Sequence, residues 1–212
     1  VTFATVSGGV RCMVNSIAFY TGEAAPVEPE LKISTSAAYA IVGGANVQFT
    51  AIFEGCDESE VTWNSSDNAV ATIDANGALV AKAMGTVVVS ATAGDLVSND
   101  VTVKVYPSNA NEISIAEARS ICSLAGTDYS PNYTVRGEIV SIDTAYNADY
   151  DNVSVTISDG SNSIQLFRLK GGSELVVGNK VIANGPLTLY GTTCEVYGGT
   201  YELLVDETLD AF

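Results

Sequence analysis

The strongest constraint on the fold is a series of short runs between Leu31 and Tyr106 in which apolar and polar residues alternate. Side chains along a β-strand point in turn to opposite faces of a sheet, so this alternation indicates strands with one buried face. Turn residues separate the runs at intervals of about 8–12 residues, which is typical of an antiparallel β-sandwich. The expected strands are 46–53, 61–64, 70–73, 79–83, 86–92 and 101–106, with a tight hairpin turn at Asp74-Ala-Asn76-Gly77.

The same segment resembles a known protein family. The likeness is carried by Val61-Thr-Trp63-Asn-Ser-Ser66-Asp, Val70-Ala-Thr-Ile73-Asp, Asn76-Gly77-Ala-Leu-Val-Ala-Lys82-Ala and Gly85-Thr. These residues resemble the bacterial immunoglobulin-like domain of group 2, which is found in adhesins and as a spacer in surface enzymes. The resemblance implies a β-sandwich used for display, spacing or adhesion, and it brings no catalytic residues. Trp63, the single tryptophan, is expected to be a core anchor without a ligand role.

The pattern changes after a short hinge at 107–111. Ser114-Ile-Ala-Glu117 has the form of a helix capping box, and apolar residues at helical spacing lead from it to Gly126, so a helix is expected here. Alternating strands follow at 133–142, 153–158, 164–169 and 180–189, with a last hairpin at 195–205. The predicted fold class is therefore all-β, an Ig-like β-sandwich followed by a small OB-like β-barrel with one helix.

The barrel segment resembles a family of OB-like domains in exported proteins of gut bacteria. The residues that carry this likeness are Tyr133-Thr-Val-Arg136-Gly137-Glu-Ile-Val, Val155-Thr-Ile-Ser158-Asp159-Gly160, Leu166-Phe167-Arg168 and Val177-Gly178-Asn179-Lys180-Val181. Near the N-terminus, Gly8-Gly-Val-Arg11 and Ser16-Ile-Ala-Phe-Tyr20 resemble the last two strands of jelly-roll-like surface domains. We expect a mature piece of a longer protein. Its predicted units are a hairpin or upstream remnant (1–22), a linker (23–30), the sandwich (31–106), the hinge (107–111) and the barrel (112–212).

Charge and composition restrict the function. Lys and Arg number 9 against 25 Asp and Glu, which gives a net charge of −16, and the segment 112–212 alone has a net charge of −9. This charge repels a phosphate backbone and argues against nucleic acid as a partner. The chain contains no histidine, the commonest general base and metal ligand. We therefore expect no catalysis, no metal and no cofactor.

The four cysteines, Cys12, Cys56, Cys122 and Cys194, show no zinc-type spacing. They could pair in three ways after export, and buried free thiols are the favoured interpretation. No apolar run reaches the roughly 20 residues of a membrane span. Asp143-Thr144-Ala145 resembles the O-glycosylation sequon of gut anaerobes, which would place the protein outside the cytoplasm.

The barrel segment is rich in aromatic residues that could form a stacking platform, although packing in the core explains most of them more simply. They are Tyr146, Tyr150, Phe167, Tyr190, Tyr197 and Tyr201. The candidate ligand contacts are Tyr146, Tyr150 and Tyr197, expected in loops, together with the cations Arg136 and Arg168. The spacing of Asp149, Asp151 and Asp159 fits no established calcium loop, so a solvated acidic loop is expected.

These observations favour a non-catalytic binding or adhesion protein, secreted or on the outer-membrane surface, with lipid anchoring of a longer chain as an option. The barrel is expected to recognise a glycan or a protein, and the Ig-like domain to act as spacer or adhesin. Two alternatives stay open. One is a barrel that binds single-stranded nucleic acid, and the other is the accessory C-terminal part of a larger extracellular enzyme.

Overall fold

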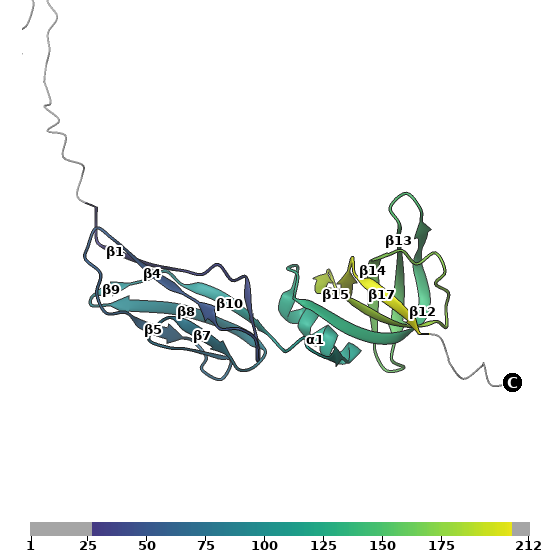
Figure 1. Ribbon diagram of the computed structural model, residues 1–212, viewed down its shortest axis with the longest axis horizontal. Coiled ribbons are helices and arrows are strands. Elements are labelled where there is room, and N and C mark those ends of the chain that lie inside the picture. Colours follow the sequence, from purple (N-terminus) through teal and green to yellow (C-terminus); the bar gives the residue numbers. More distant parts are fainter. Residues whose placement is uncertain (1–26, 205–212) are drawn as a thin grey trace, which may run out of the picture.

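The computed structural model describes residues 27–204, which form two β-rich parts joined end to end, with the helix in the second part (Figure 1). The all-β class with one helix is therefore confirmed for the described residues. The predicted hairpin at 1–22 and the first residues of the predicted linker lie outside this range. No helix within the range 27–204 has the length and apolar character needed to cross a membrane.

The first part is a sandwich of two layers (Figure 1). Its strands are β1 (Glu30–Ser34), β2 (Tyr39–Ile41), β3 (Val47–Gln48), β4 (Thr50–Glu54), β5 (Thr62–Ser65), β6 (Ala71–Ile73), β7 (Ala78–Ala81), β8 (Gly85–Ala93), β9 (Leu96–Val97) and β10 (Val101–Tyr106). One layer has the order β2–β10–β8–β5, with β9 paired to β8. The other consists of β1 with β4 and of β3–β7–β6. The predicted antiparallel sandwich is confirmed, with a parallel pair between β2 and β10.

The core of the sandwich follows from the alternation in the sequence. Val87 and Val89 on β8 are fully buried, and Leu31 on β1 faces them from the other layer. Phe49 is the large aromatic residue at the centre, with 1% of its surface exposed. Trp63 on β5 is only partly buried and packs against the Phe49 ring at a centroid distance of 6.1 Å. Trp63 therefore packs against the core as a partly buried residue rather than as its central anchor.

The strand predicted at 46–53 is divided at Phe49. The Phe49 N–H donates to the carbonyl of Gly77 at 2.8 Å, and the chain changes its partner from β7 to β1 at this point. The predicted hairpin turn between β6 and β7 is present. The Asp74 carboxylate accepts a hydrogen bond from the Asn76 N–H at 2.9 Å, and Gly77 has a φ of +78°. This left-handed conformation suits glycine, since it lacks a Cβ.

Helix α1 (Ile115–Ala125) begins at the predicted capping box. The Ser114 hydroxyl accepts a hydrogen bond from the Glu117 N–H, while the Glu117 carboxylate accepts one from the Ser114 N–H at 2.9 Å. These bonds hold the pKa of Glu117 below its usual value. Gly126 ends the helix with a φ of +61°. The apolar face predicted for this helix is buried against the second part.

The strands of the second part close into a ring. They are β11 (Glu112–Ile113), β12 (Asn132–Asn147), β13 (Asn152–Ser158), β14 (Ser163–Lys170), β15 (Lys180–Tyr190), β16 (Thr193–Tyr197) and β17 (Thr200–Leu204). Strand β12 pairs with β13, β13 with β14, β14 in parallel with β16, β16 with β15, and β15 again with β12. Five strands therefore enclose a common apolar core, as the sequence pattern predicts for a small barrel.

Strand β12 makes this closure possible because it has two partners. Its residues 132–138 pair with β15, and residues 138–147 pair with β13. Gly137 lies where one partner gives way to the other. A Cβ added there would come within 3.0 Å of the Ile157 side chain and of the Ser158 carbonyl. Glycine therefore allows β12 and β13 to approach closely at the bend of the barrel.

The predicted hairpin at 195–205 is wrong. Strands β16 and β17 do not pair with each other, and both pair antiparallel with β15. Thr188 pairs with Glu195 and Asn184 pairs with Thr200, so β16 and β17 contain one residue more than the stretch of β15 that they face. Gly198-Gly199 therefore forms a β-bulge, and β16 and β17 follow one continuous edge of β15. The hairpin turn lies instead between Tyr190 and Thr193. A double glycine suits either a turn or a bulge, and only the pairing with β15 distinguishes them.

Aromatic residues join the two parts. Tyr106 ends β10 but is buried in the core cluster of the second part, with 1% of its surface exposed. Tyr39 packs edge-on against the Tyr106 ring at 5.6 Å. The hydroxyl of the buried Tyr133 donates to the Pro107 carbonyl at 2.7 Å. Burial also raises the pKa of Tyr133, so this hydroxyl stays a donor at neutral pH.

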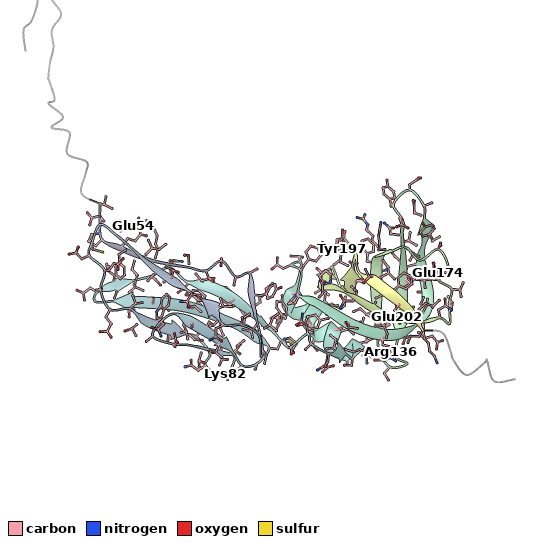
Figure 2. The ribbon with its side chains drawn as sticks, in the orientation of Figure 1. Glu54, Lys82, Arg136, Glu174, Tyr197 and Glu202 are labelled. Carbon is pink, nitrogen blue, oxygen red and sulfur yellow. A yellow bond between two sulfur atoms is a disulfide. The ribbon has the colours of Figure 1, made fainter. Side chains whose placement is uncertain are left out.

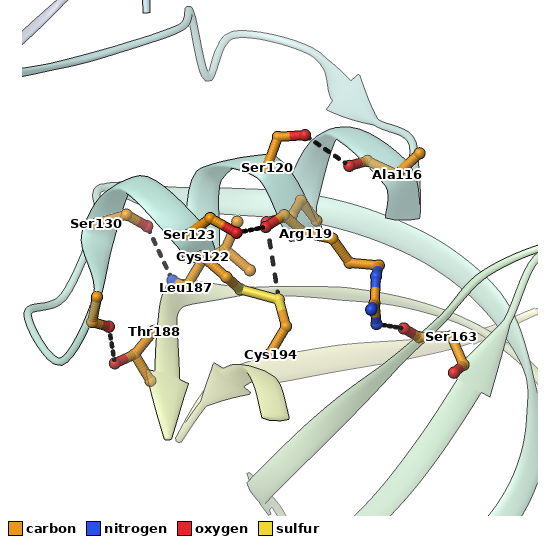
Figure 3. The surroundings of a disulfide bond; sticks show 12 residues. Ala116, Arg119, Ser120, Cys122, Ser123, Ser130, Ser163, Leu187, Thr188 and Cys194 are labelled. Carbon is orange, nitrogen blue, oxygen red and sulfur yellow. Dashed lines mark hydrogen bonds between the residues drawn. A yellow bond between two sulfur atoms is a disulfide. The ribbon is translucent and has the colours of Figure 1, made fainter. Parts of the chain in front are cut away.

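A disulfide connects α1 to the barrel (Figure 3). It joins Cys122 to Cys194 on β16, with a Cα–Cα distance of 5.6 Å. The prediction of buried free thiols is therefore wrong for these two residues. They are 72 residues apart in the sequence, and only the packing of α1 against β16 brings them together. Cys56 is exposed and free, and Cys12 lies outside the described residues.

Removing this disulfide should destabilise the barrel. For the double variant Cys122→Ser, Cys194→Ser, we expect the free energy of unfolding to fall by about 4 kcal/mol, because a cross-link of this span restricts the unfolded chain. Urea unfolding followed by far-UV circular dichroism measures this change. Trp63 fluorescence reports on the sandwich and should keep its midpoint, and Cys56→Ser is the matched control. An unchanged barrel transition would contradict the prediction.

Candidate ligand-binding groove

The outer faces of β14, β16 and β15 form a groove in the second part. On β16, Cys194 and Val196 point into the core, so Glu195 and Tyr197 point outward. Their cross-strand neighbours also line the groove, which encloses about 540 Å³. The lining residues used below are Tyr129, Phe167, Arg168, Thr188, Glu195 and Tyr197, and we call this surface the aromatic groove.

A β-bulge places two consecutive residues of β14 on this face. Val153 pairs with Leu169 and Val155 pairs with Leu166, so β14 has one residue more than β13 between these two pairs. The extra residue is Arg168, whose φ is +52° and whose N–H donates to the Ser154 hydroxyl at 3.1 Å. Positive φ is uncommon outside glycine and often marks a functional position. The bulge directs Arg168 toward the groove, where its guanidinium lies 5.2 Å from the centre of the Phe167 ring.

Three of the aromatic residues that line the groove pack against one another. Tyr197 lies between Tyr129 and Phe167, with ring centroids 5.2 Å and 5.8 Å away at tilted angles. Tyr129 comes from the loop between α1 and β12, so the helix and the barrel both contribute to this surface. Burial and the neighbouring Tyr197 raise the pKa of Tyr129, which keeps its hydroxyl protonated and able to donate.

Glu195 lines the groove and is only 5% exposed. Its cross-strand neighbours donate their hydrogen bonds elsewhere: the Gln165 amide to Asp143 at 3.0 Å, and the Thr188 hydroxyl to the Gly126 carbonyl at 3.2 Å. Burial alone raises the pKa of Glu195. Within residues 27–204, no side-chain oxygen is fully enclosed without a partner, so the Glu195 carboxylate opens to the groove.

The groove brings together two of the five predicted ligand contacts. These are Tyr197 and Arg168, and Tyr197 lies at the end of a strand rather than in a loop. Arg136 lies in a different part of the barrel (Figure 2), where its guanidinium binds the Glu112 carboxylate at 3.1 Å. The sequence alone could not show that Arg168 lines the groove and Arg136 does not, because the bulge at Arg168 depends on the pairing with β13.

The remaining two predicted contacts lie at the hairpin between β12 and β13. Tyr146 belongs to β12, so its predicted loop position is wrong, and its hydroxyl donates to Asp151 at 2.9 Å. Tyr150 lies in the turn, as predicted, and is 74% exposed. Asp151 also binds Lys170 at 2.9 Å, and these two contacts lower its pKa. This hairpin is thus held by polar contacts rather than by an aromatic platform.

Sequence reasoning missed several residues of the groove, among them Tyr129 and Glu195. Tyr129 follows the helix in a loop that carries no periodic signal. Glu195 was assigned to a hairpin, although its spacing of two from Tyr197 places both on one face of a strand. That spacing is the signal in the sequence that could have identified Glu195. Using it requires recognising that Gly198-Gly199 is a bulge in a continuous strand and not a hairpin turn.

Comparison with known proteins identifies the first part of the chain. Residues 32–105 match the family model described as bacterial Ig-like domain (group 2). The resemblance predicted for this segment is therefore confirmed. A search of curated proteins finds no match to the chain.

Solved structures show only a low overall similarity. They include the intimin–Tir90 complex (17% identity, 82% of this chain and 99% of that chain, TM-score 0.32) and domains 4 and 5 of the S-layer protein SbsC (11%, 81% and 100%, 0.29). The Stn1–Ten1 complex of S. pombe is 19% identical over 37% of this chain, with a TM-score of 0.29, and the chain spans 62% of that protein. At these TM-scores, the similarities carry no conclusion about function.

Replacing Glu195 with glutamine should stabilise the protein at neutral pH. Burial raises the pKa of Glu195 in the folded state. At any pH above the pKa of this residue in the unfolded state, the side chain therefore destabilises the folded state. A buried polar group without a partner costs about 1–3 kcal/mol, and we expect Glu195→Gln to recover part of this at pH 7. The gain should vanish at low pH, where both states hold a neutral side chain.

Urea unfolding from pH 3 to pH 8 measures this difference. Glu202→Gln removes an exposed carboxylate on β17 and serves as the matched control. If Glu195→Gln stabilised the protein equally at every pH, the gain would not come from ionisation of Glu195, and the prediction would be wrong.

Proposed function

Starting from an N-terminal segment that matches the bacterial Ig-like domain of group 2, we propose that the chain is a cell-surface or secreted binding protein. The barrel binds a glycan in the aromatic groove, and the Ig-like domain holds the barrel away from the surface or adds adhesion. The observation that carries this proposal is the cluster of Tyr129, Phe167 and Tyr197 beside Glu195, which forms no ion pair within the described part of the chain.

The composition of the groove suits a sugar. Aromatic rings bury the apolar faces of a flat ligand, and a few polar groups fix its orientation. Here the rings of Phe167 and Tyr197 supply the apolar faces, and Glu195 supplies an acceptor for hydroxyl groups. The groove is open along one side of the barrel, so it could follow part of a longer polysaccharide.

Binding without hydrolysis is the function best supported for this site. Glycoside hydrolysis commonly requires two carboxyl groups about 5–10 Å apart. Among the described residues that line the groove, Glu195 is the single carboxylate. The chain also has no histidine that could act as a base. These facts support a binding module, which agrees with a display role for the Ig-like domain.

Single-stranded nucleic acid is a second candidate ligand. One observation supports it, the presence of Arg168 beside the aromatic rings of the groove. Stacking platforms for bases combine such rings with a basic groove. The groove instead places Glu195 beneath the rings, in a chain with a net charge of −16. We therefore expect no binding of single-stranded DNA in a fluorescence polarisation assay, even at low salt. Salt-sensitive binding that is lost in Arg168→Ala would favour this alternative instead.

Truncating the groove aromatics should weaken glycan binding. After a glycan array identifies a ligand, we expect Tyr197→Ala and Phe167→Ala each to raise its dissociation constant by about tenfold or more, because a central aromatic contact contributes about 1–3 kcal/mol. Isothermal titration calorimetry measures the change. Tyr150→Ala, in the exposed turn outside the groove, is the matched control and should bind normally. Equal loss in all three variants, or in none, would place the ligand elsewhere.

A further inference from the structure

We propose that Glu195 makes the aromatic groove selective for a sugar that carries a free amino group over the same sugar with that nitrogen acetylated. The inference rests on the proposed glycan binding and names the ligand class. Three features of the groove carry it: a buried carboxylate with no hydrogen-bond donor among residues 27–204, no ion pair to it within that range, and aromatic faces around the same space.

The buried Glu195 carboxylate needs hydrogen-bond donors. Glu195 is 5% exposed and offers only acceptor oxygens when it is ionised. Gln165 and Thr188, its partners on the two flanking strands, are engaged with Asp143 and with a backbone carbonyl. A ligand in the groove must therefore supply the donors that the protein does not supply. An ammonium group has three donors and satisfies this requirement with a single atom.

The charge of the Glu195 carboxylate also favours a cationic ligand. None of the ion pairs in the described part of the chain includes Glu195. Arg168 is the cation that lines the groove, but its guanidinium lies over the Phe167 ring. Burial is the one cause of the raised pKa of Glu195, and no cation offsets it. A positive group from the ligand would supply the missing counter-charge in a partly dehydrated space, where ion pairs are screened least.

The aromatic rings of the groove favour a cation as well. A cation is attracted to the negative face of an aromatic ring, and several rings around one space form a cage for ammonium groups. The Tyr197 ring lies 5.2 Å from the Tyr129 ring and 5.8 Å from the Phe167 ring, measured between centroids, and Tyr197 is on the same strand as Glu195. Arg168 on the Phe167 face shows that this ring already accepts a cation. An acetylated nitrogen has no charge and gains neither interaction.

The test compares two oligosaccharides of equal length, chitosan tetramer with free amines and chitin tetramer with acetylated nitrogens. We expect the whole protein to bind the amine form about tenfold more tightly in isothermal titration calorimetry, as a cation held by a carboxylate and aromatic faces would give. Glu195→Gln should bring the two affinities within about twofold and retain the chitin tetramer. Arg168→Gln should keep or increase the preference, because it removes a repelling charge.

Two controls separate this site from the general attraction of an acidic protein for a polycation. Glu202→Gln removes the same charge from an exposed position and should leave the preference unchanged. Tyr197→Ala should weaken both sugars. If Glu202→Gln and Glu195→Gln reduce the preference equally, the attraction is a surface effect and the inference is wrong.

The remaining outcomes distinguish the inference from the proposed function. If the two tetramers bind equally and both depend on Tyr197, the amine selectivity is wrong while glycan binding stands. If neither tetramer binds but a neutral glycan binds through Tyr197, the amine selectivity is again wrong while glycan binding stands. If no glycan binds and a lysine-rich peptide occupies the groove in a Glu195-dependent manner, both proposals fail and the partner is a protein.

Discussion

The double pairing of β12 is the constraint on which the second part depends. One strand pairs with β15 along its first half and with β13 along its second half, and this closes the ring. Closure fixes which residues of the five strands face the core and which face outward. Gly137 permits the change of partner because a side chain there would collide with Ile157. The aromatic groove exists on the outside because β14, β16 and β15 are held side by side by that closure.

Local irregularities then shape the groove. The bulge at Arg168 turns an extra side chain of β14 outward, and the bulge at Gly198-Gly199 lets β16 and β17 follow a single strand, β15. The disulfide between Cys122 and Cys194 attaches the helix directly beside Glu195, and the loop that follows the helix brings Tyr129 over the groove. Strand closure, bulges and a cross-link therefore act together to hold side chains from three regions of the sequence around one space.

The two parts of the chain have different physical characters. The sandwich consists of short strands around an apolar core and matches a family associated with display, whereas the barrel carries the groove with its buried carboxylate. Tyr106, buried in the second part although it ends a strand of the first, joins them with little free chain. A binding barrel held firmly on a sandwich is consistent with the proposed role at a cell surface. The excess of acidic residues disfavours anionic partners.

The sequence by itself determined the elements. Alternation with period two defined most strands of both parts, Ser114 and Glu117 defined the start of the helix, and the residues around Trp63 identified the Ig-like family. These signals are local, because a side chain's direction along a strand or a cap depends on its near neighbours. The tertiary structure alone decided the disulfide, the continuity of β16 with β17, and the meeting of Tyr129, Arg168 and Glu195. Those features depend on which distant strands pair and in what register, and that pairing leaves no trace in local spacing.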